Sequence, residues 1–172
     1  MRLRSGRTVV RRIRPEDIGP LLAAARRVIG ARMASEEVVR RIAASQPDAL
    51  WTFCRKDRVV GYLAMLMLNC NGLEVLLSDT FDFCDPPLSL LANSDDTPAA
   101  IYIWGVLAPP LAVDGVAEVM SRLRSDKYNS ANIYAFQNTV QGARFQRRLG
   151  FAPVLGHPRN LYRYVRLCNH VH

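Results

Sequence analysis

The chain of 172 residues carries a formal net charge of +8 and is 49% hydrophobic and 22% charged, which suits one globular domain with a sizeable core. No apolar run approaches the roughly 20 residues that a membrane-spanning helix needs, and the first residues lack the apolar core of a secretory signal. These features argue against a membrane protein and predict a cytoplasmic location.

The charges are unevenly distributed along the chain. Six arginines crowd residues 2–14, whereas residues 59–120 hold eight acidic side chains and no lysine or arginine. A basic segment can attract nucleic acid, but no groove-reading or aromatic motif accompanies it, so nucleic acid is not an expected partner. The four cysteines are far apart and form no C-x-x-C pair, which predicts free thiols and no metal.

The first part of the chain predicts a strand, two helices and a hairpin. Gly30 ends the apolar stripe of the first helix, and Ser35 can cap the second. Asp17 is the predicted N-cap of the first helix. The predicted elements, in chain order, are residues 8–14, 18–29, 36–44, 49–54 and 59–68.

Residues 69–99 are less regular and are rich in aspartate and proline. A short helical turn is predicted at 73–77, followed by loop chemistry. Apolar residues such as Phe81 and Phe83 argue against disorder. We therefore expect one domain over residues 1–172, with an insertion at about 69–99 that packs over the sheet.

The strongest predicted strand follows, at residues 100–107. It is nearly all apolar, as a central strand covered on both faces should be, and Gly105 within it suggests a bulge. His157 lies in a Gly-His-Pro turn and is predicted to be on the surface. The remaining predicted elements are a helix at 115–124, a strand at 132–136, a helix at 138–149 and a strand at 160–167.

Residues 138–151 predict an amphipathic helix that ends at Gly150 and leads into a strand. This stretch resembles the end of the acetyl-coenzyme A site in GCN5-related N-acetyltransferases, the GNAT superfamily, whose usual form is N-x-x-A-x-x-(L/F)-Y-x-(K/R)-x-G-F. Aligned on the Gly-Phe ending, Phe145 matches the apolar position and Arg148 the basic one. Gln146 stands where the family has a tyrosine.

A second stretch, residues 107–117, joins a predicted strand to a predicted helix. Free amides and the helix dipole make such a junction an anion site. The stretch is similar to the family's pyrophosphate loop, (Q/R)-x-x-G-x-(G/A), with Gly115 and Ala117 at the small positions. Two positions depart from it: Ala112 replaces the arginine or glutamine, and Asp114 adds a negative charge.

The resemblance covers about residues 8–167 and implies an α+β fold, an α/β/α sandwich. Its central sheet would be mixed, mostly antiparallel, and opened by a V-shaped splay between two central strands. Acetyl-coenzyme A, or another acyl-coenzyme A, would be the co-substrate. Main-chain groups at Val106 and Leu107 would hold pantetheine and polarise the thioester carbonyl. The implied cofactor-binding residues are Val106, Leu107, Ala112, Val113, Gly115, Val116, Ala117, Asn138 and Phe145.

The implied chemistry needs an acid for the departing thiol, and the amide of Gln146 cannot serve as one. Tyr102 and Tyr134 are the candidates for that acid. The catalytic prediction is Tyr102, Tyr134 and Asp82. The candidates for a base are Tyr102 and three loop aspartates, Asp79, Asp82 and Asp85.

These features predict an acyl-coenzyme A-dependent N-acyltransferase that moves acetyl to a primary amine by direct attack, mostly through positioning. The acceptor would be a small-molecule or protein amine, and the acid-rich loop favours a cationic one. The alternative is a degenerate GNAT fold that binds acyl-coenzyme A or a protein partner without catalysis, which Ala112, Asp114 and Gln146 motivate. A homodimer is compatible with both interpretations, and no membrane partner is expected.

Overall fold

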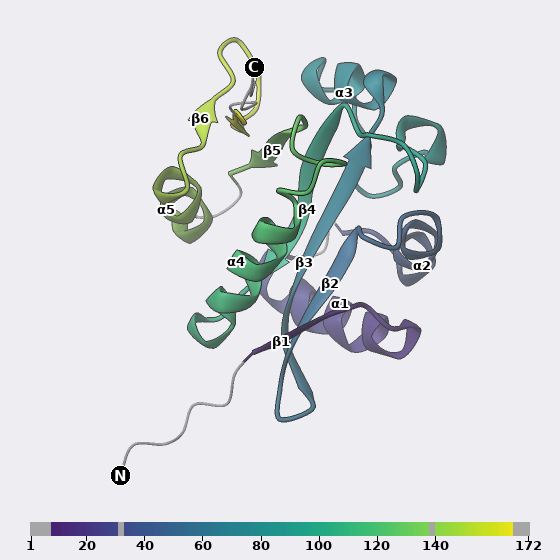
Figure 1. The fold of residues 1–172 in the computed structure, drawn as a ribbon, viewed down its shortest axis with the longest axis vertical. Coiled ribbons are helices and arrows are strands. Elements are labelled where there is room, and N and C mark those ends of the chain that lie inside the picture. Colours follow the sequence, from purple (N-terminus) through teal and green to yellow (C-terminus); the bar gives the residue numbers. More distant parts are fainter. Residues whose placement is uncertain (1–7, 31–32, 138–139, 167–172) are drawn as a thin grey trace.

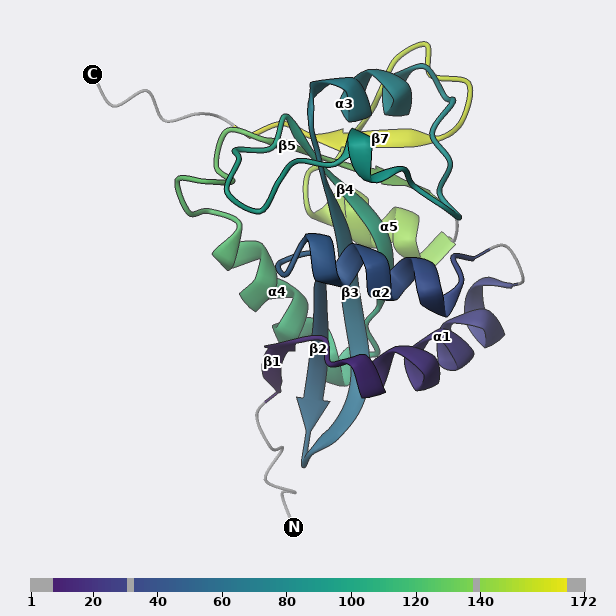
Figure 2. The same ribbon diagram turned by 90° about the vertical axis from the view of Figure 1, so that its right-hand side faces the viewer.

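Residues 8–30, 33–137 and 140–166 are described by the computed structural model, and they form one sheet between two layers of helices (Figures 1 and 2). The strands are β1 (Val9–Arg12), β2 (Leu50–Arg55), β3 (Arg58–Leu68), β4 (Ala100–Leu107), β5 (Asn132–Phe136), β6 (Ala152–Pro153) and β7 (Leu161–Tyr164). They lie in the order β1-β2-β3-β4-β5-β7-β6, and among the described strands only β4 and β5 pair in parallel. The predicted mixed, mostly antiparallel sheet is confirmed.

Local caps fix where the first helices begin. Asp17, predicted as the N-cap of the first helix, lies inside it instead, and its carboxylate accepts the Arg14 amide at 3.0 Å. Arg11 also donates to Asp17, at 2.6 Å, and this bond lowers the pKa of the carboxyl group. The second helix follows Ser35, as predicted, and the Ser35 hydroxyl accepts the Val38 amide at 3.2 Å. The helices are α1 (Pro15–Ile29), α2 (Glu36–Ser45), α3 (Cys70–Leu77), α4 (Val113–Arg122) and α5 (Val140–Arg148), with 3-10 turns at Leu88–Leu90 and Pro110–Ala112.

The sheet separates two apolar cores. One packs α1, α2 and α3 against the sheet and includes the fully buried Ile18, Ile42 and Leu76. The other packs α4 against the opposite face, around Phe53 and Val119. Figure 2 shows α1 and α2 over the first face, with α4 beyond the sheet. In the described part of the chain, no helix is both long enough and apolar enough to cross a membrane.

The insertion at 69–99 is an ordered cover over the end of β3, with α3 at its start (Figure 1). The predicted short turn is in fact the eight-residue helix α3. It begins earlier than predicted because Asn69 caps it, accepting the Gly72 amide at 2.9 Å. Phe81 is buried in the core beneath α3. Leu76, Phe81 and Leu91 of this segment share one buried core with the sheet.

The end of the sheet differs from the prediction. The strand predicted at 160–167 is β7, which ends at Tyr164. Before it lies the two-residue strand β6, which pairs antiparallel with β7 and is the strand predicted to follow Gly150. This strand is only two residues long, and its second residue, Pro153, has no backbone N–H to extend the ladder.

Candidate functional site

The parallel strands β4 and β5 separate halfway along β4. Their last pair is Ile103 with Ala135. Beyond it, β4 continues to Leu107 beside β3, with no partner on its β5 side among the described strands. The predicted V-shaped splay is therefore present, and one edge of β4 is open along its second half.

A β-bulge coincides with the start of this splay. Ala64 of β3 pairs with Gly105, and the next residue, Met65, pairs with Ile103. Trp104 is therefore the extra residue of the bulge. A bulge bends its strand and increases the local twist, which accounts for the turn of β4 away from β5. The bulge predicted from Gly105 is confirmed, one residue earlier.

The backbone direction of the open edge follows from the pairing with β3. Met65 donates its amide away from β4, to the Ala49 carbonyl at 2.7 Å. Because backbone groups alternate in direction along a strand, Tyr62 then directs its own groups to β4, where its partner is Leu107. The Leu107 amide is therefore directed to β3, whereas Val106 directs its amide and carbonyl into the splay.

Helix α4 begins close to the end of β4, after the turn Pro110–Ala112. Among the described residues no side chain caps this helix, and the first amides of a helix have no intrahelical acceptor. The Ala112 amide is already used, because it donates to the Pro109 carbonyl at 2.7 Å. This corrects the prediction that the Ala112 amide would bind a diphosphate. The amides left for an anion are those of the first turn, Val113, Asp114 and Gly115.

Exposed apolar side chains gather at the same end of the sheet. Val106 lies near the end of β4, Leu111 and Val113 lie at the start of α4, and Val140 begins α5. The carboxyl ends of neighbouring parallel strands meet at one edge of a sheet, where ligands bind in many α/β folds. An apolar rim there suits a ligand with an uncharged arm.

Gly115 is required by packing. A Cβ at this position would lie 2.5 Å from Cδ1 of Phe53, a fully buried residue of β2. The contact with Phe53 therefore explains the glycine at this position of the loop. Ala117, the other predicted small residue, lies on the exposed side of α4.

We expect Gly115→Ala to lower the free energy of unfolding by about 1–3 kcal/mol, because the added methyl group overpacks the site beside Phe53. Helix propensity alone would make alanine stabilising by about 1 kcal/mol. A decrease in the free energy of unfolding would therefore show that the clash with Phe53 outweighs helix propensity. Ala117→Leu, on the exposed side of α4, is the control and should change stability by less than about 0.5 kcal/mol. Urea denaturation measures both variants, and a stabilised Gly115→Ala protein would contradict the packing role.

Two glutamines lie beside the carbonyl that ends β5. Gln146 of α5 donates its side-chain amide to the Phe136 carbonyl at 3.1 Å. Its Oε1 is buried without a hydrogen-bond partner, as is Nε2 of Gln137, within the described part of the chain. Such atoms favour a ligand that carries amide donors and acceptors, and pantetheine carries both. The predicted Asn138, and the side chain of the predicted Phe145, lie outside the described residues.

The two predicted tyrosines lie side by side. Tyr102 and Tyr134 are register partners across β4 and β5, and both are buried. Burial raises the pKa of the Tyr102 phenol, and the positive charge of Arg159 opposes that rise only in part. The raised pKa keeps the phenol protonated at neutral pH, so Tyr102 can donate a hydrogen bond but does not serve as a base. Asp82 is exposed, and its carboxylate accepts the backbone amides of the turn that follows, from Cys84 at 2.9 Å and Asp85 at 3.2 Å.

An aromatic cluster that the sequence analysis did not name lies beside the start of the splay. The ring centroid of Phe83 is 5.1 Å from that of Phe136 and 5.3 Å from that of Tyr102. Trp104, the bulge residue, donates its indole N–H to the Phe83 carbonyl at 2.8 Å. Phe83 of the insertion therefore borders the point where β4 and β5 separate. From the sequence, Phe83 indicates only that residues 69–99 are ordered, because no local pattern places its ring beside Phe136 and Tyr102.

Two side chains of the turn between β6 and β7, Arg159 and His157, bond to the insertion. Arg159 forms an ion pair with Asp79. The side chain of His157 is 1% exposed, and its Nε2 lies 3.2 Å from the Leu76 carbonyl of α3. The prediction of a surface histidine is wrong, because α3 and the insertion fold over the turn.

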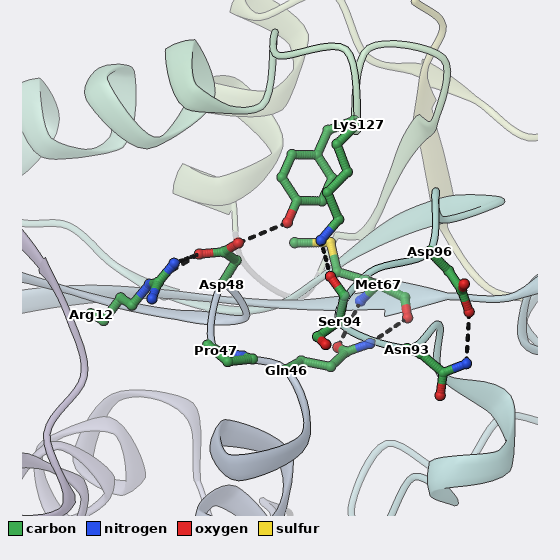
Figure 3. A pocket seen from close by; sticks show the side chains of 10 residues that line it. Arg12, Gln46, Pro47, Asp48, Met67, Asn93, Ser94, Asp96 and Lys127 are labelled. Carbon is green, nitrogen blue, oxygen red and sulfur yellow. Dashed lines mark hydrogen bonds and ion pairs between the residues drawn. The ribbon is translucent and has the colours of Figure 1, made fainter.

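Two adjoining hollows, of about 170 and 250 Å³, lie elsewhere, beside β1, β2 and the end of α4. They share Arg12, Asp48 and Tyr128. These side chains form hydrogen bonds with one another: the Asp48 carboxylate accepts from Arg12 at 2.7 Å and from the Tyr128 hydroxyl at 2.9 Å (Figure 3). Their polar groups are therefore already paired within the protein. We therefore place the candidate site at the splay.

Comparisons with known proteins bear on the fold. No protein-family model matches the sequence, and no curated protein does. Among solved structures, the loading GNATL domain of CurA from Lyngbya majuscula is 13% identical, with a TM-score of 0.66 over 92% of this chain and 97% of that one. Arabidopsis thaliana NAA60 in complex with acetyl-CoA is 14% identical, with a TM-score of 0.59 over 92% of this chain and 99% of its own. The GphF GNAT-like decarboxylase in complex with isobutyryl-CoA is 17% identical, with a TM-score of 0.52 over 84% and 72% of the two chains.

These likenesses establish the class of fold. The chain has the GNAT fold, with a mixed sheet, helices on both faces and a splay between its two central parallel strands.

Proposed function

We propose that the protein is a divergent member of the GNAT superfamily and an acyl-coenzyme A-dependent N-acyltransferase. The open edge of β4, where Val106 directs its amide into the splay, is the observation that carries this proposal. Several structural neighbours were solved with acetyl-CoA or isobutyryl-CoA, which supports an acyl-coenzyme A as the co-substrate.

In the proposed complex, the diphosphate lies at the first turn of α4 and the pantetheine arm runs beside Gln137 and Gln146. The thioester carbonyl accepts a hydrogen bond from the Val106 amide, which stabilises the oxyanion that develops during attack. The acceptor nitrogen forms the new bond to the carbonyl carbon, the carbon–sulfur bond breaks with its electron pair going to sulfur, and the nitrogen releases a proton to solvent. A proton from solvent then replaces the one that a phenol gives to the departing thiolate, so the protein ends the step unchanged. Tyr102 and Tyr134 are the proposed donors of a proton to the departing thiolate.

The acceptor is proposed to be a primary amine, but the loop aspartates no longer argue that it is cationic. Asp79 pairs with Arg159, and Asp85 pairs with Arg41 of α2. Asp82 accepts the amides of its own turn. These carboxylates are therefore engaged with groups of the protein itself.

The alternative is a non-catalytic module that binds acyl-coenzyme A or a protein partner. Three observations favour it: Ala112 offers no guanidinium to a diphosphate, Asp114 is exposed beside the amides, and the Gln146 amide is already bonded to the Phe136 carbonyl. The fold does not assign the reaction, since one neighbour is a GNAT-like decarboxylase. Calorimetry with acetyl-, propionyl- and butyryl-coenzyme A, followed by an amine panel, separates the two proposals. Binding without turnover supports the module, and an absence of binding excludes the transferase.

We expect Asp114→Asn to tighten coenzyme A binding by about fivefold at low salt, because it removes roughly 1 kcal/mol of repulsion between a carboxylate and a diphosphate. The same change should lower the free energy of unfolding by about 0.3–1 kcal/mol, because an acid at a helix N-terminus is stabilising. Glu118→Gln, one turn further along α4, is the control and should leave affinity nearly unchanged. Unaltered affinity in Asp114→Asn across a salt series would place the diphosphate away from this turn.

A further inference from the structure

Arg159 holds its guanidinium group against the aromatic cluster beside the splay. The carbon at its centre lies 5.0 Å from the ring centroid of Phe83 and 5.0 Å from that of Phe136. Asp79 forms an ion pair with its Nε. Two rings and a carboxylate therefore hold the plane of this guanidinium in one orientation. Because the side chain is already ordered, it loses little conformational entropy when a ligand binds.

The location connects Arg159 to the proposed reaction centre. Phe136 directly follows Ala135, the last β5 residue that pairs with β4. Its ring also packs against Tyr102, with centroids 5.9 Å apart. Phe83, the other ring under the guanidinium, accepts the indole N–H of the bulge residue Trp104 through its carbonyl. Arg159 thus lies over the same cluster that borders the start of the splay.

Part of the guanidinium is available to a ligand. Arginine carries five N–H donors in a planar fork. Asp79 takes the Nε donor through its carboxylate and one terminal nitrogen through its carbonyl, at 3.4 Å. The other terminal nitrogen has no partner among the described residues, and the side chain is 47% exposed. A rigid, half-exposed fork with free donors matches the geometry of a carboxylate.

The same contacts argue against a cationic ligand. Each of the two rings has the Arg159 guanidinium over it, which is the position that an ammonium group would take. Asp79, the nearest carboxylate, is paired with Arg159 itself. A second cation would have to displace the arginine from both partners.

We propose that Arg159 binds a carboxylate carried by the substrate. The inference rests on the proposed acyl transfer and narrows its substrate class. The carboxylate belongs either to the acceptor, as in an amino acid or a peptide terminus, or to the acyl group, as in a dicarboxylic acyl-coenzyme A. Arg159 is in this account a specificity-determining residue that touches substrate at a distance from the reacting bond.

The test compares charged and neutral substrates of matched size. Glycine and glycinamide serve as acceptors with acetyl-coenzyme A, and succinyl- and butyryl-coenzyme A serve as donors to glycinamide. We expect wild type to prefer the carboxylate of one pair by about tenfold or more in kcat/KM, and Arg159→Gln to abolish that preference. Arg159→Lys keeps the charge without the fork and should retain only part of it. The pair that shows the preference identifies the source of the carboxylate.

Arg122→Gln is the matched control. Arg122 also lies over an aromatic ring, Trp51, at 4.8 Å, and also pairs with a carboxylate, Glu118, at 2.7 Å. Its side chain is 48% exposed, but it lies on α4 beside the hollow at Asp48, away from the cluster. This variant should preserve the preference. Equal losses on charged and neutral substrates in Arg159→Gln would overturn the proposal, and so would faster transfer to butylamine, which would identify the rings as a cation site.

Failure of the proposed transfer activity is distinguishable from failure of this inference. If wild type transfers no acyl group, the Arg159 Nε–H resonance is followed by NMR during titration with N-acetylglycine and with succinate. A shift that N-acetylglycinamide and succinamide do not cause supports the carboxylate site without any turnover. The absence of a shift with both carboxylates overturns it.

Discussion

Val106→Pro should lower kcat by about 100- to 1000-fold, the usual loss when one oxyanion donor is removed. Proline removes the backbone N–H that the alternation along β4 directs into the splay. The ladder with β3 loses no hydrogen bond, because the amides on that side belong to the neighbouring residues. Val106 is partly exposed, so the fold should tolerate the change.

Val106→Ala is the matched control for this result. It shortens the same side chain but keeps the amide, so its kcat should stay close to that of wild type. Transfer from acetyl-coenzyme A to the best acceptor of an amine panel is the measurement, with circular dichroism to confirm that both variants are folded. Equal activity in the proline and alanine variants would show that the Val106 amide takes no part in the reaction.

Gln46→Leu should lower the free energy of unfolding by about 2–6 kcal/mol, because it leaves the Ala92 carbonyl and the Met67 amide unpaired at about 1–3 kcal/mol each. The Met67 carbonyl keeps the Ala92 amide as a donor, at 2.8 Å. Gln46 is 3% exposed and follows the last residue of α2. Its side chain donates to the carbonyls of Met67 and Ala92, both at 2.8 Å, and accepts the Met67 amide at 3.1 Å. This one residue therefore joins a helix, β3 and the end of the insertion.

Ser45→Ala, one position earlier, is the control for Gln46→Leu and should change stability by less than about 0.5 kcal/mol. Urea denaturation with a constant slope between variants gives both values. If Gln46→Leu costs no more than about 1 kcal/mol, the net value of one hydrogen bond, the backbone groups have found other partners and the joining role fails.

Features that depend on local pattern were predictable from the sequence. The apolar run at 100–107 gave the central strand, and Gly105 within it indicated the bulge that opens the splay. Ser35 marked the start of α2. These signals work because periodicity and capping are properties of neighbouring residues.

Features that depend on distant contacts were not predictable. The burial of His157 requires α3, whose Leu76 lies 81 positions away in the chain. The position of the Arg159 side chain is set by Asp79, which lies 80 positions away in the chain. It is also set by the rings of Phe83 and Phe136, which belong to two other segments. Gly115 matched a family pattern, yet the structure ties it to Phe53 of β2. Spacing in a motif identifies a position, whereas the physical reason for the residue depends on what the fold brings beside it.

A crystal structure of the protein with acetyl-coenzyme A would show whether the cofactor binds at the splay between β4 and β5. We expect the diphosphate at the amides of residues 113–115 and the thioester oxygen about 2.7–3.1 Å from the Val106 nitrogen. Acetyl-coenzyme A bound instead in the hollows around Asp48, or a splay that closes as β5 pairs with the second half of β4, would contradict this expectation.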